Sequence, residues 1–396
     1  MTVNAMMGKF NLRILILLSI GHCTVDIYQG ALPAILPFLK EELRLSYATA
    51  GIILILANVT SSILQPLFGF LSDKKERAFL LPVGALTAGL GLSLLSVPST
   101  FLPVLLLVTL SGLGVAAYHP EGYKTAYFYT GPRAATGMSF FSVGGNVGMA
   151  LGPIISIPVI AYLGFSSLPV VVLPALLFTA VIIYCRKAVA LPERTIRAGA
   201  HDSDGEPVRI PYLALTILVA VVVMRSWMQM GLLSYIPFYY INYLKGDAVY
   251  AGKLISIFLL GGAVGTLAGA PLADRWGFSF FIALSMAVAA LTFPLIFVLE
   301  RFPVLLGITL FWLGMVLVST FSVTVVMSQK LLPKSLGIAS GLTTGFAIGA
   351  GGIGVTLLGV VADRYGVPFA MKSIFIFPVV GIILALTLNY PVRGKV

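Results

Sequence analysis

The sequence has little charge for its length. Only 10% of its 396 residues are Asp, Glu, Lys or Arg, whereas 59% are hydrophobic. A soluble protein of this size cannot bury so much apolar surface. Apolar runs of about 20 residues recur along the whole chain, each long enough to cross a hydrocarbon core of roughly 30 Å. The runs are continuously apolar rather than alternating, which argues against a β-barrel. The composition therefore predicts a helical membrane protein with many spans.

Cysteine and histidine are also scarce. The two cysteines, Cys23 and Cys185, fall in different predicted spans and are too few for a disulfide framework. Three histidines are too few and too scattered to predict a metal site. The first apolar run is longer than the core of a signal peptide and carries polar groups at mid-depth, so we expect it to be retained. The net charge of +11 does not predict nucleic-acid binding, because the charges lie at helix ends.

The apolar runs predict an all-α fold of twelve transmembrane helices. Each run ends at a charged or turn-rich break. The predicted spans are 12–37, 47–71, 78–97, 101–123, 134–161, 165–185, 211–242, 249–272, 278–299, 303–328, 335–361 and 368–390.

One long hydrophilic stretch divides these spans into two sets of six. We therefore predict a six-helix bundle over 1–186, a linker over 187–210 and a second bundle over 211–396. The halves match at an offset of 200 residues, for example at Pro37 and Pro237 and at Gly145 and Gly345. Several matches at one offset indicate duplication. Two parallel repeats around a central site are the architecture that alternating access requires.

Lysine and arginine predict the orientation of the chain in a cell membrane. Most of these residues fall in the segments that share one side with the N-terminus and the linker. By the positive-inside rule, both termini and the linker are expected in the cytoplasm, and the membrane is expected to be the inner, or cell, membrane.

The first predicted span contains ionisable residues that an apolar helix does not need. An ionisable side chain at mid-membrane costs roughly 2.5–3.5 kcal/mol on insertion scales, so function is the default hypothesis. His22 and Asp26 are four residues apart, and Gln29 extends the same helix face. They lie about 15–21 Å from the start of the helix, close to the membrane midplane. We predict that Asp26 and His22 take up and release protons in a central aqueous site.

The seventh predicted span carries a corresponding polar pair, of which one residue is cationic. Arg225 and Gln229 are again four residues apart at similar depth. Because the first and seventh helices are equivalent in duplicated halves, we expect the two polar stripes to face each other across a cavity. Arginine suits a phosphonate, phosphate or carboxylate, so Arg225 and Gln229 are predicted substrate-binding residues. The alternative is a static Asp26–Arg225 bridge that ties the halves together.

The fourth predicted span ends in a second polar group. Pro120 can kink the helix and turn His119 and Glu121 toward the translocation path, where both would take part in proton coupling. The alternative for Glu121 is a pairing with Lys124 or Arg133 as a cytoplasmic gate.

Other polar and aromatic residues of the spans are weaker candidates. Gln65 and Asn146 are predicted cavity residues together with Gln29, although hydrogen bonding between helices explains most such side chains equally well. Tyr28 is a predicted lining residue, with interfacial anchoring as the alternative.

Two loop segments and one glycine-rich span carry recognisable motifs. The segment after the second span is GFLSDKKER (69–77), and its weaker counterpart after the eighth is GAPLADRWG (269–277). In the first, Gly69 permits close helix packing, and Asp73 can cap a neighbouring helix N-terminus or pair with a basic residue, which would form a latch. The fifth span contains GGNVGMALGP (144–153). Its glycines present a smooth face for helix packing.

These motifs resemble those of the major facilitator superfamily. The loop segment is similar to the Gly-x-x-x-Asp-Arg/Lys motif of that superfamily, and GGNVGMALGP is similar to the motif of its antiporters. The segments DIYQGALPAILPFL, SSILQPLFGFLSD and AAYHPEGYKTA resemble the fosmidomycin-resistance group of exporters. The resemblance covers all twelve spans. It assigns gating to the following residues: Gly69, Asp73, Lys74, Arg77, Asp274 and Arg275. Ala270 departs from the pattern in the second copy, which puts its latch role in doubt.

The resemblance implies secondary active transport rather than enzymatic activity. It implies a proton-driven antiporter that exports a small organic anion or drug, such as a phosphonate antibiotic, and confers drug resistance by efflux. No cofactor is expected besides the proton gradient, and a monomer is expected to function. Uptake by a symporter or uniporter is the alternative. An intramembrane enzyme using His22, Asp26 and His119 is a rival hypothesis that no HExxH or nucleophile motif supports.

Overall fold

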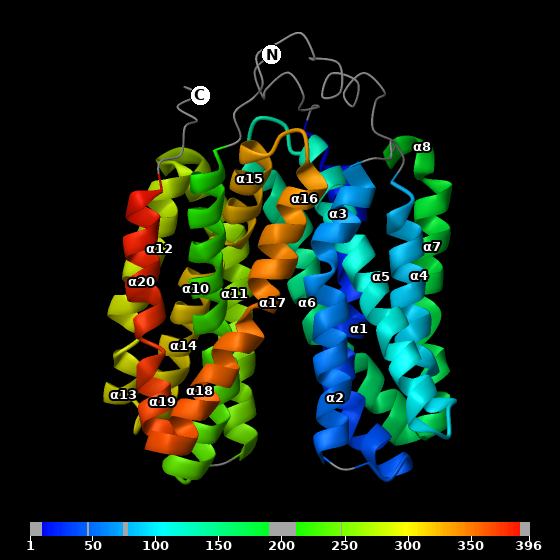
Figure 1. Cartoon of the computed structure of the whole chain (residues 1–396), viewed down its shortest axis with the longest axis horizontal. Helices are drawn as coiled ribbons and strands as arrows, with labels where there is room; N and C mark the ends of the chain where they lie inside the picture. Colours follow the sequence, from blue (N-terminus) through cyan, green and yellow to red (C-terminus); the bar gives the residue numbers. More distant parts are fainter. Residues whose placement is uncertain (1–9, 46, 74–77, 190–210, 247, 389–396) are drawn as a thin grey trace. The chain divides into compact units, whose positions relative to one another are not determined.

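The computed structural model describes residues 10–45, 47–73, 78–189, 211–246 and 248–388. Among these residues, eleven helices are long and apolar enough to cross a membrane, and the apolar helix Leu80–Ser96 is shorter. Together they account for the twelve predicted spans and confirm the all-α fold (Figure 1). Several helices extend beyond the prediction, such as the first, which continues to Glu42.

The chain folds as two compact units. The N-terminal unit comprises Met1–Arg209 and Leu332–Phe346, and the C-terminal unit comprises Ile210–Leu331 and Ala347–Val396. The N-terminal unit contains the elements α1 (Leu12–Glu42), α2 (Tyr47–Asn58), η2 (Val59–Ile63), α3 (Gln65–Asp73), α4 (Leu80–Ser93), η3 (Leu94–Ser96), α5 (Phe101–Phe128), α6 (Ala134–Leu163), η4 (Phe165–Val172), α7 (Leu173–Tyr184), α8 (Arg186–Val189), α16 (Leu336–Ser340) and η6 (Gly341–Phe346).

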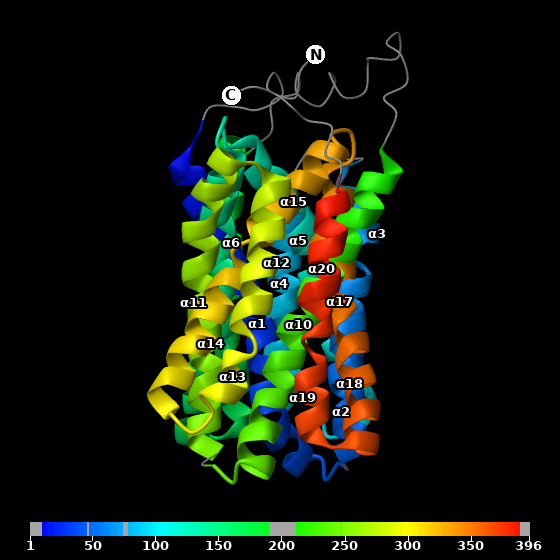
Figure 2. The same cartoon turned by 90° about the vertical axis from the view of Figure 1, so that its left-hand side faces the viewer.

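The C-terminal unit has the same all-helical character (Figure 2). It contains α10 (Tyr212–Phe238), η5 (Tyr239–Tyr243), α11 (Ala248–Trp276), α12 (Phe278–Thr292), α13 (Leu295–Val298), α14 (Pro303–Val318), α15 (Phe321–Leu331), α17 (Ala347–Gly349), α18 (Gly351–Tyr365), α19 (Val367–Ser373) and α20 (Ile376–Thr387). Its core is formed by buried apolar side chains such as Met228, Phe258, Phe293 and Leu313.

The units differ from the predicted halves at one span. Residues 332–346, the first part of the eleventh predicted span, pack in the N-terminal unit rather than in the C-terminal one. The reason is close backbone packing, because a Cβ at Gly69 would lie 2.3 Å from the carbonyl oxygen of Gly337. The predicted linker 187–210 also begins inside α8, and its remainder lies outside the described residues.

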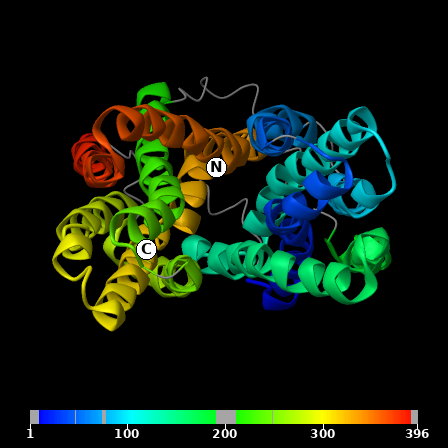
Figure 3. The ribbon, with the colours of Figure 1, turned by 90° about the horizontal axis from the view of Figure 1, so that it is seen from below.

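Within the N-terminal unit, α1 and α6 pack along their lengths (Figure 3). The glycines of the GGNVGMALGP motif make this possible. A Cβ at Gly144 would lie 2.1 Å from the carbonyl oxygen of Ser19, and one at Gly148 would lie 2.2 Å from that of Cys23. The glycine stripe is therefore a helix-packing surface that brings α6 against the polar face of α1.

Two turns between consecutive helices depend on glycine. Gly164 ends α6 with φ +85°, and Gly366 ends α18 with φ +86°. Both occupy a backbone region that other residues rarely adopt, so the chain can reverse directly into the next helix. These equivalent turns agree with the duplication predicted from the sequence.

Two spans of the N-terminal unit are interrupted by π-helical segments. The second span changes from α2 to η2 before α3 begins, and the eleventh changes from α16 to η6. π-Helical turns loosen the regular backbone ladder and frequently occur at functional sites. Here η2 and η6 lie against each other.

Candidate functional site

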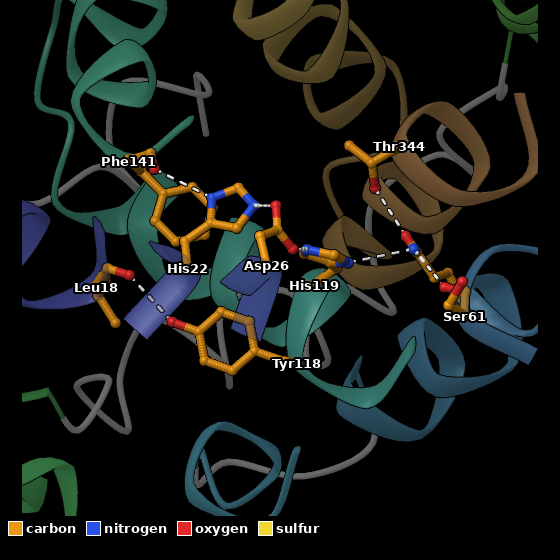
Figure 4. Close-up of polar contacts among 9 residues, drawn as sticks. Leu18, His22, Asp26, Ser61, Tyr118, His119, Phe141 and Thr344 are labelled. Carbon is orange, nitrogen blue, oxygen red and sulfur yellow. Dashed lines mark hydrogen bonds and ion pairs between the residues drawn. The ribbon is translucent and has the colours of Figure 1, made fainter. Parts of the chain in front are cut away.

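The polar face of α1 forms a buried cluster with α5 (Figure 4). His22 Nε2 lies 3.4 Å from Asp26 Oδ2, and His119 Nε2 lies 3.0 Å from Asp26 Oδ1. All three side chains are at most 10% exposed. We call His22, Asp26 and His119 the acid–base cluster. The sequence placed His22 beside Asp26 through their helical spacing, and the fold adds His119 from 93 residues farther along the chain.

Surrounding groups fix the orientation of His22. Its Nδ1 lies 3.1 Å from the carbonyl oxygen of Phe141, and its ring stacks on the Phe141 ring at 4.5 Å. Gly145, one turn farther along α6, leaves the space that the cluster occupies. A Cβ there would lie 2.5 Å from His22 Nε2 and 2.6 Å from Asp26 Oδ2. The glycine-rich motif therefore accommodates the cluster as well as packing the helices.

The YHPEG segment anchors α5 beside α1. The Tyr118 hydroxyl donates a hydrogen bond to the carbonyl oxygen of Leu18 at 3.0 Å. Tyr118 and His119 are neighbours in α5, so this contact also holds His119 at the level of Asp26. Pro120 lies inside the continuous helix α5, where it cannot donate the usual backbone hydrogen bond.

Gln65 extends the acid–base cluster toward the eleventh span. Its Nε2 lies 3.3 Å from His119 Nδ1 and 2.7 Å from the carbonyl oxygen of Ser61. Its Oε1 accepts a hydrogen bond from the Thr344 hydroxyl at 3.0 Å. The polar network thus continues from α1 through α5 and α3 to η6. Gln65 was a predicted cavity residue. Thr344 was not predicted, because the threonines and glycines around it are typical of ordinary helix packing.

Glu121 lies in a separate contact from the acid–base cluster. Its Oε1 is 3.2 Å from Lys124 Nζ, and the carboxylate is fully buried. Lys124 also donates to the carbonyl oxygen of Ser72 at 2.6 Å, near the end of α3. The structure therefore has the Glu121–Lys124 pairing that was the alternative to a proton-coupling role for Glu121.

Asp73 caps the start of α16. Its two carboxylate oxygens accept hydrogen bonds from the backbone N–H groups of Gly337 and Ile338, at 2.8 and 3.1 Å. The positive end of a helix favours a carboxylate in this position. Together with Gly69 and Gly337, Asp73 fastens α16 to α3. Lys74 and Arg77, also assigned to gating, lie outside the described residues.

Arg225 is buried in the C-terminal unit, with 2% exposure. Its Nη1 donates to the hydroxyls of Thr320 and Thr324 at 3.4 Å, and its guanidinium carbon lies 5.3 Å from the centre of the Phe321 ring. Gln229 is half-buried one turn later in α10. The predicted facing of Arg225 and Asp26 stays a prediction.

The remaining predicted residues take varied positions. The Tyr28 hydroxyl donates to the carbonyl oxygen of Val171 and accepts from the N–H of Ala175, so it links α1 to η4 and α7. Gln29 and Tyr28 line a cavity of about 150 Å³ inside the N-terminal unit. Asn146 is half-buried on α6, while Asp274 is half-buried and Arg275 exposed in the last turn of α11.

With this geometry in place, comparison with known proteins assigns the family. The family model described as Major Facilitator Superfamily matches residues 18–354. The chain belongs to the Major Facilitator Superfamily. It is accordingly a multi-pass membrane transporter.

Two curated proteins match nearly the whole chain. One is an uncharacterized MFS-type transporter, YfnC, of Bacillus subtilis (strain 168), 36% identical over 93% of this chain and 91% of the relative. Another is the fosmidomycin resistance protein of Escherichia coli (strain K12), 31% identical over 92% of this chain and 90% of the relative.

Solved structures share the fold at low sequence identity. The superfamily transporter FucP in the outward conformation aligns with a TM-score of 0.73 at 15% identity, covering 95% of this chain and 98% of FucP. The human organic anion transporter MFSD10 aligns with a TM-score of 0.70 at 16% identity, covering 94% of this chain and 99% of MFSD10. These likenesses confirm the twelve-helix architecture.

Proposed function

We propose that this transporter is a proton-coupled antiporter that exports a small organic anion or drug, such as a phosphonate antibiotic. We place it in the cell (inner) membrane with both termini in the cytoplasm, working as a monomer by alternating access. The observation that carries the proposal is the buried acid–base cluster on α1 and α5. The 31% identity to a fosmidomycin resistance protein supports the substrate class and the direction.

We infer that His22 and Asp26 share a proton. A backbone carbonyl only accepts hydrogen bonds, so His22 Nδ1 must carry hydrogen where it meets the Phe141 carbonyl. If His22 is neutral, its Nε2 then presents a lone pair to Asp26 Oδ2 at 3.4 Å. Two lone pairs repel, so the arrangement is favourable only with a proton on one of the two atoms. We assign the transported proton to the His22 Nε2–Asp26 Oδ2 pair.

Arg225 is our candidate for the anion-binding group. A buried guanidinium, held beside the hydroxyls of Thr320 and Thr324, offers N–H donors to phosphonate or carboxylate oxygens. Gln229, Gln29, Gln65 and Asn146 stay predicted substrate-binding residues. For Tyr28, its backbone hydrogen bonds favour a positioning role over substrate contact.

The contact of Asp73 with α16 is our candidate for a gate. Two charge-assisted hydrogen bonds and the Gly69–Gly337 approach hold α16 in the N-terminal unit. In alternating access, such a contact must form in one state and break in the other. We propose that it closes the cytoplasmic side and that Lys74 and Arg77 contribute charge there.

A proton symporter is the second candidate. A solved structure of similar fold is the Escherichia coli fucose:proton symporter FucP, at 14% identity. If Asp26 pairs with Arg225 as the sequence predicts, an anion that binds Arg225 would also favour proton uptake by Asp26. Antiport therefore requires that the doubly loaded transporter cannot change conformation.

The experiment that tests proton coupling is flux in proteoliposomes with the Asp26→Asn variant. We expect this variant to lose transport driven by a pH gradient while it still folds and inserts. Glu300→Gln is the matched control, because Glu300 accepts a hydrogen bond from Tyr239 in the C-terminal unit and has no place in the cluster. Undiminished gradient-driven flux in Asp26→Asn would remove the cluster from the coupling mechanism.

A further inference from the structure

Gln65 connects the acid–base cluster to the mobile part of the proposed mechanism. It is the first residue of α3, separated from η2 by Leu64, and the residue is 3% exposed. Its amide meets Ser61 of η2, His119 of α5 and Thr344 of η6. These three partners come from three different spans, so the amide is restrained from every side.

The contact with the Ser61 carbonyl determines the orientation of the Gln65 side-chain amide. A backbone carbonyl oxygen only accepts, so the group 2.7 Å from Ser61 must be the NH₂ end of Gln65. The same nitrogen lies 3.3 Å from His119 Nδ1 and directs its second hydrogen there. The amide oxygen at the other end accepts from the Thr344 hydroxyl.

This orientation determines the protonation of His119. Because His119 Nδ1 receives a hydrogen, it must present a lone pair, and the neutral ring carries its hydrogen on Nε2. That N–H donates to Asp26 Oδ1 at 3.0 Å. A second proton on Nδ1 would face the NH₂ group of Gln65. Turning the amide would relieve this contact but would set its oxygen against the Ser61 carbonyl oxygen.

We propose that Gln65 is a positioning residue that keeps His119 neutral while Thr344 holds the amide, and lets His119 take up a proton when η6 leaves the N-terminal unit. The proposal deepens the proposed function and rests on it. By reciprocity, protonation of His119 favours release of η6. The proton load of the cluster and the state of the gate are thereby linked through one side chain.

The other groups that face His119 do not change the role assigned to Gln65. From α1 it faces Asp26 and His22, and its own helix contributes the Tyr118 ring. Tyr123 and Cys23 lie one step farther out, against His22 and Asp26 respectively. From α6, Phe141 contributes a ring and a carbonyl beside His22. η2, α3 and η6 contribute the carbonyl, amide and hydroxyl already described.

The same contact favours a proton over a metal ion. Three atoms that could coordinate a metal ion lie within 4.8 Å of one another, one each from His22, Asp26 and His119. A metal ion would need the lone pair of His119 Nε2. The Gln65 amide commits that nitrogen to an N–H group, so the trio suits a shared proton.

The test is nitrogen NMR of the full-length protein carrying ¹⁵N-histidine. The chain has three histidines, so each ring can be assigned with single variants such as His119→Gln. We expect the wild-type His119 ring to show the signature of the neutral form with its hydrogen on Nε2. In Thr344→Val and Gln65→Leu, we expect a detectable population of rings that carry hydrogen on Nδ1, because the amide then no longer requires a lone pair there.

Two variants separate the proposal from a general structural effect. Thr344→Ser keeps the hydroxyl and should restore the wild-type profile. Thr343→Val is the matched control, because the Thr343 hydroxyl donates to the Ala339 and Ser340 carbonyls of its own helix. The proposal is overturned if wild-type and Gln65→Leu proteins give the same His119 nitrogen signature, or if Thr344→Val behaves like Thr343→Val. This readout needs neither substrate nor gradient, so it can fail while Asp26→Asn still shows proton coupling.

Discussion

At the scale of single residues, the absence of a side chain at Gly145 is what permits the acid–base cluster. We predict that Gly145→Ala displaces His22 or Asp26, because the added Cβ would lie within 2.6 Å of both side chains. A displacement of about 1 Å can lower a rate by roughly 100-fold, and we expect a loss of gradient-driven flux on this scale. Gly352→Ala is the control, since a Cβ there meets nothing within 4 Å. Equal flux in the two variants would contradict the prediction.

The buried Glu121–Lys124 pair makes a second prediction at this scale. Lys124→Met should destabilise the protein by about 3–5 kcal/mol, because it leaves a fully buried carboxylate without its cation. The double variant Glu121→Gln with Lys124→Met should recover most of the loss, since it removes both charges. Thermal unfolding in detergent measures both effects. If the double variant were less stable than Lys124→Met, the pairing would not explain the stability of this region.

At the scale of helices, the contact of α3 with α16 makes the gate testable. Asp73→Asn should weaken it, because one backbone N–H would then face an amide NH₂ group instead of a carboxylate oxygen. We expect labelling of a cysteine at buried Ser340 to increase by about tenfold, in a background lacking Cys23 and Cys185. Asp363→Asn, at an exposed position of α18, is the control. Unchanged labelling in Asp73→Asn would argue against the latch.

The helices themselves were largely predictable from the sequence, because uninterrupted apolar runs and charged breaks determine where spans begin and end. Within the site, helical spacing was enough to pair His22 with Asp26. The loop motif marked Asp73 as a helix cap or as the partner of a basic residue. The spacing could not place His119, Phe141 or Thr344, since these meet the cluster through packing between helices far apart in sequence. The sequence also did not predict that the eleventh span is divided between the two units. This division depends on backbone packing of Gly69 against Gly337 rather than on hydropathy.

At the scale of the whole molecule, duplicated halves and a titratable cluster are compatible with both antiport and symport. The family and the fold therefore do not determine whether protons and substrate move in the same direction or in opposite directions. At equilibrium, the ratio of substrate concentrations that a given pH gradient supports depends only on whether transport is symport or antiport. It does not depend on which way the protein is inserted in the vesicle membrane. This property makes reconstituted protein of mixed orientation suitable for deciding between the two.

For the proposed antiporter, fosmidomycin should accumulate in proteoliposomes whose lumen is more acidic than the medium. Protons leaving the lumen then drive the substrate inward, while an alkaline lumen should deplete it. With the membrane potential clamped at zero, coupling of one proton to one substrate limits the concentration ratio to about tenfold per pH unit. Asp26→Asn vesicles should equilibrate without accumulation under either gradient. Accumulation in an alkaline lumen instead would identify a symporter, and the same acid–base cluster would then carry protons together with the substrate.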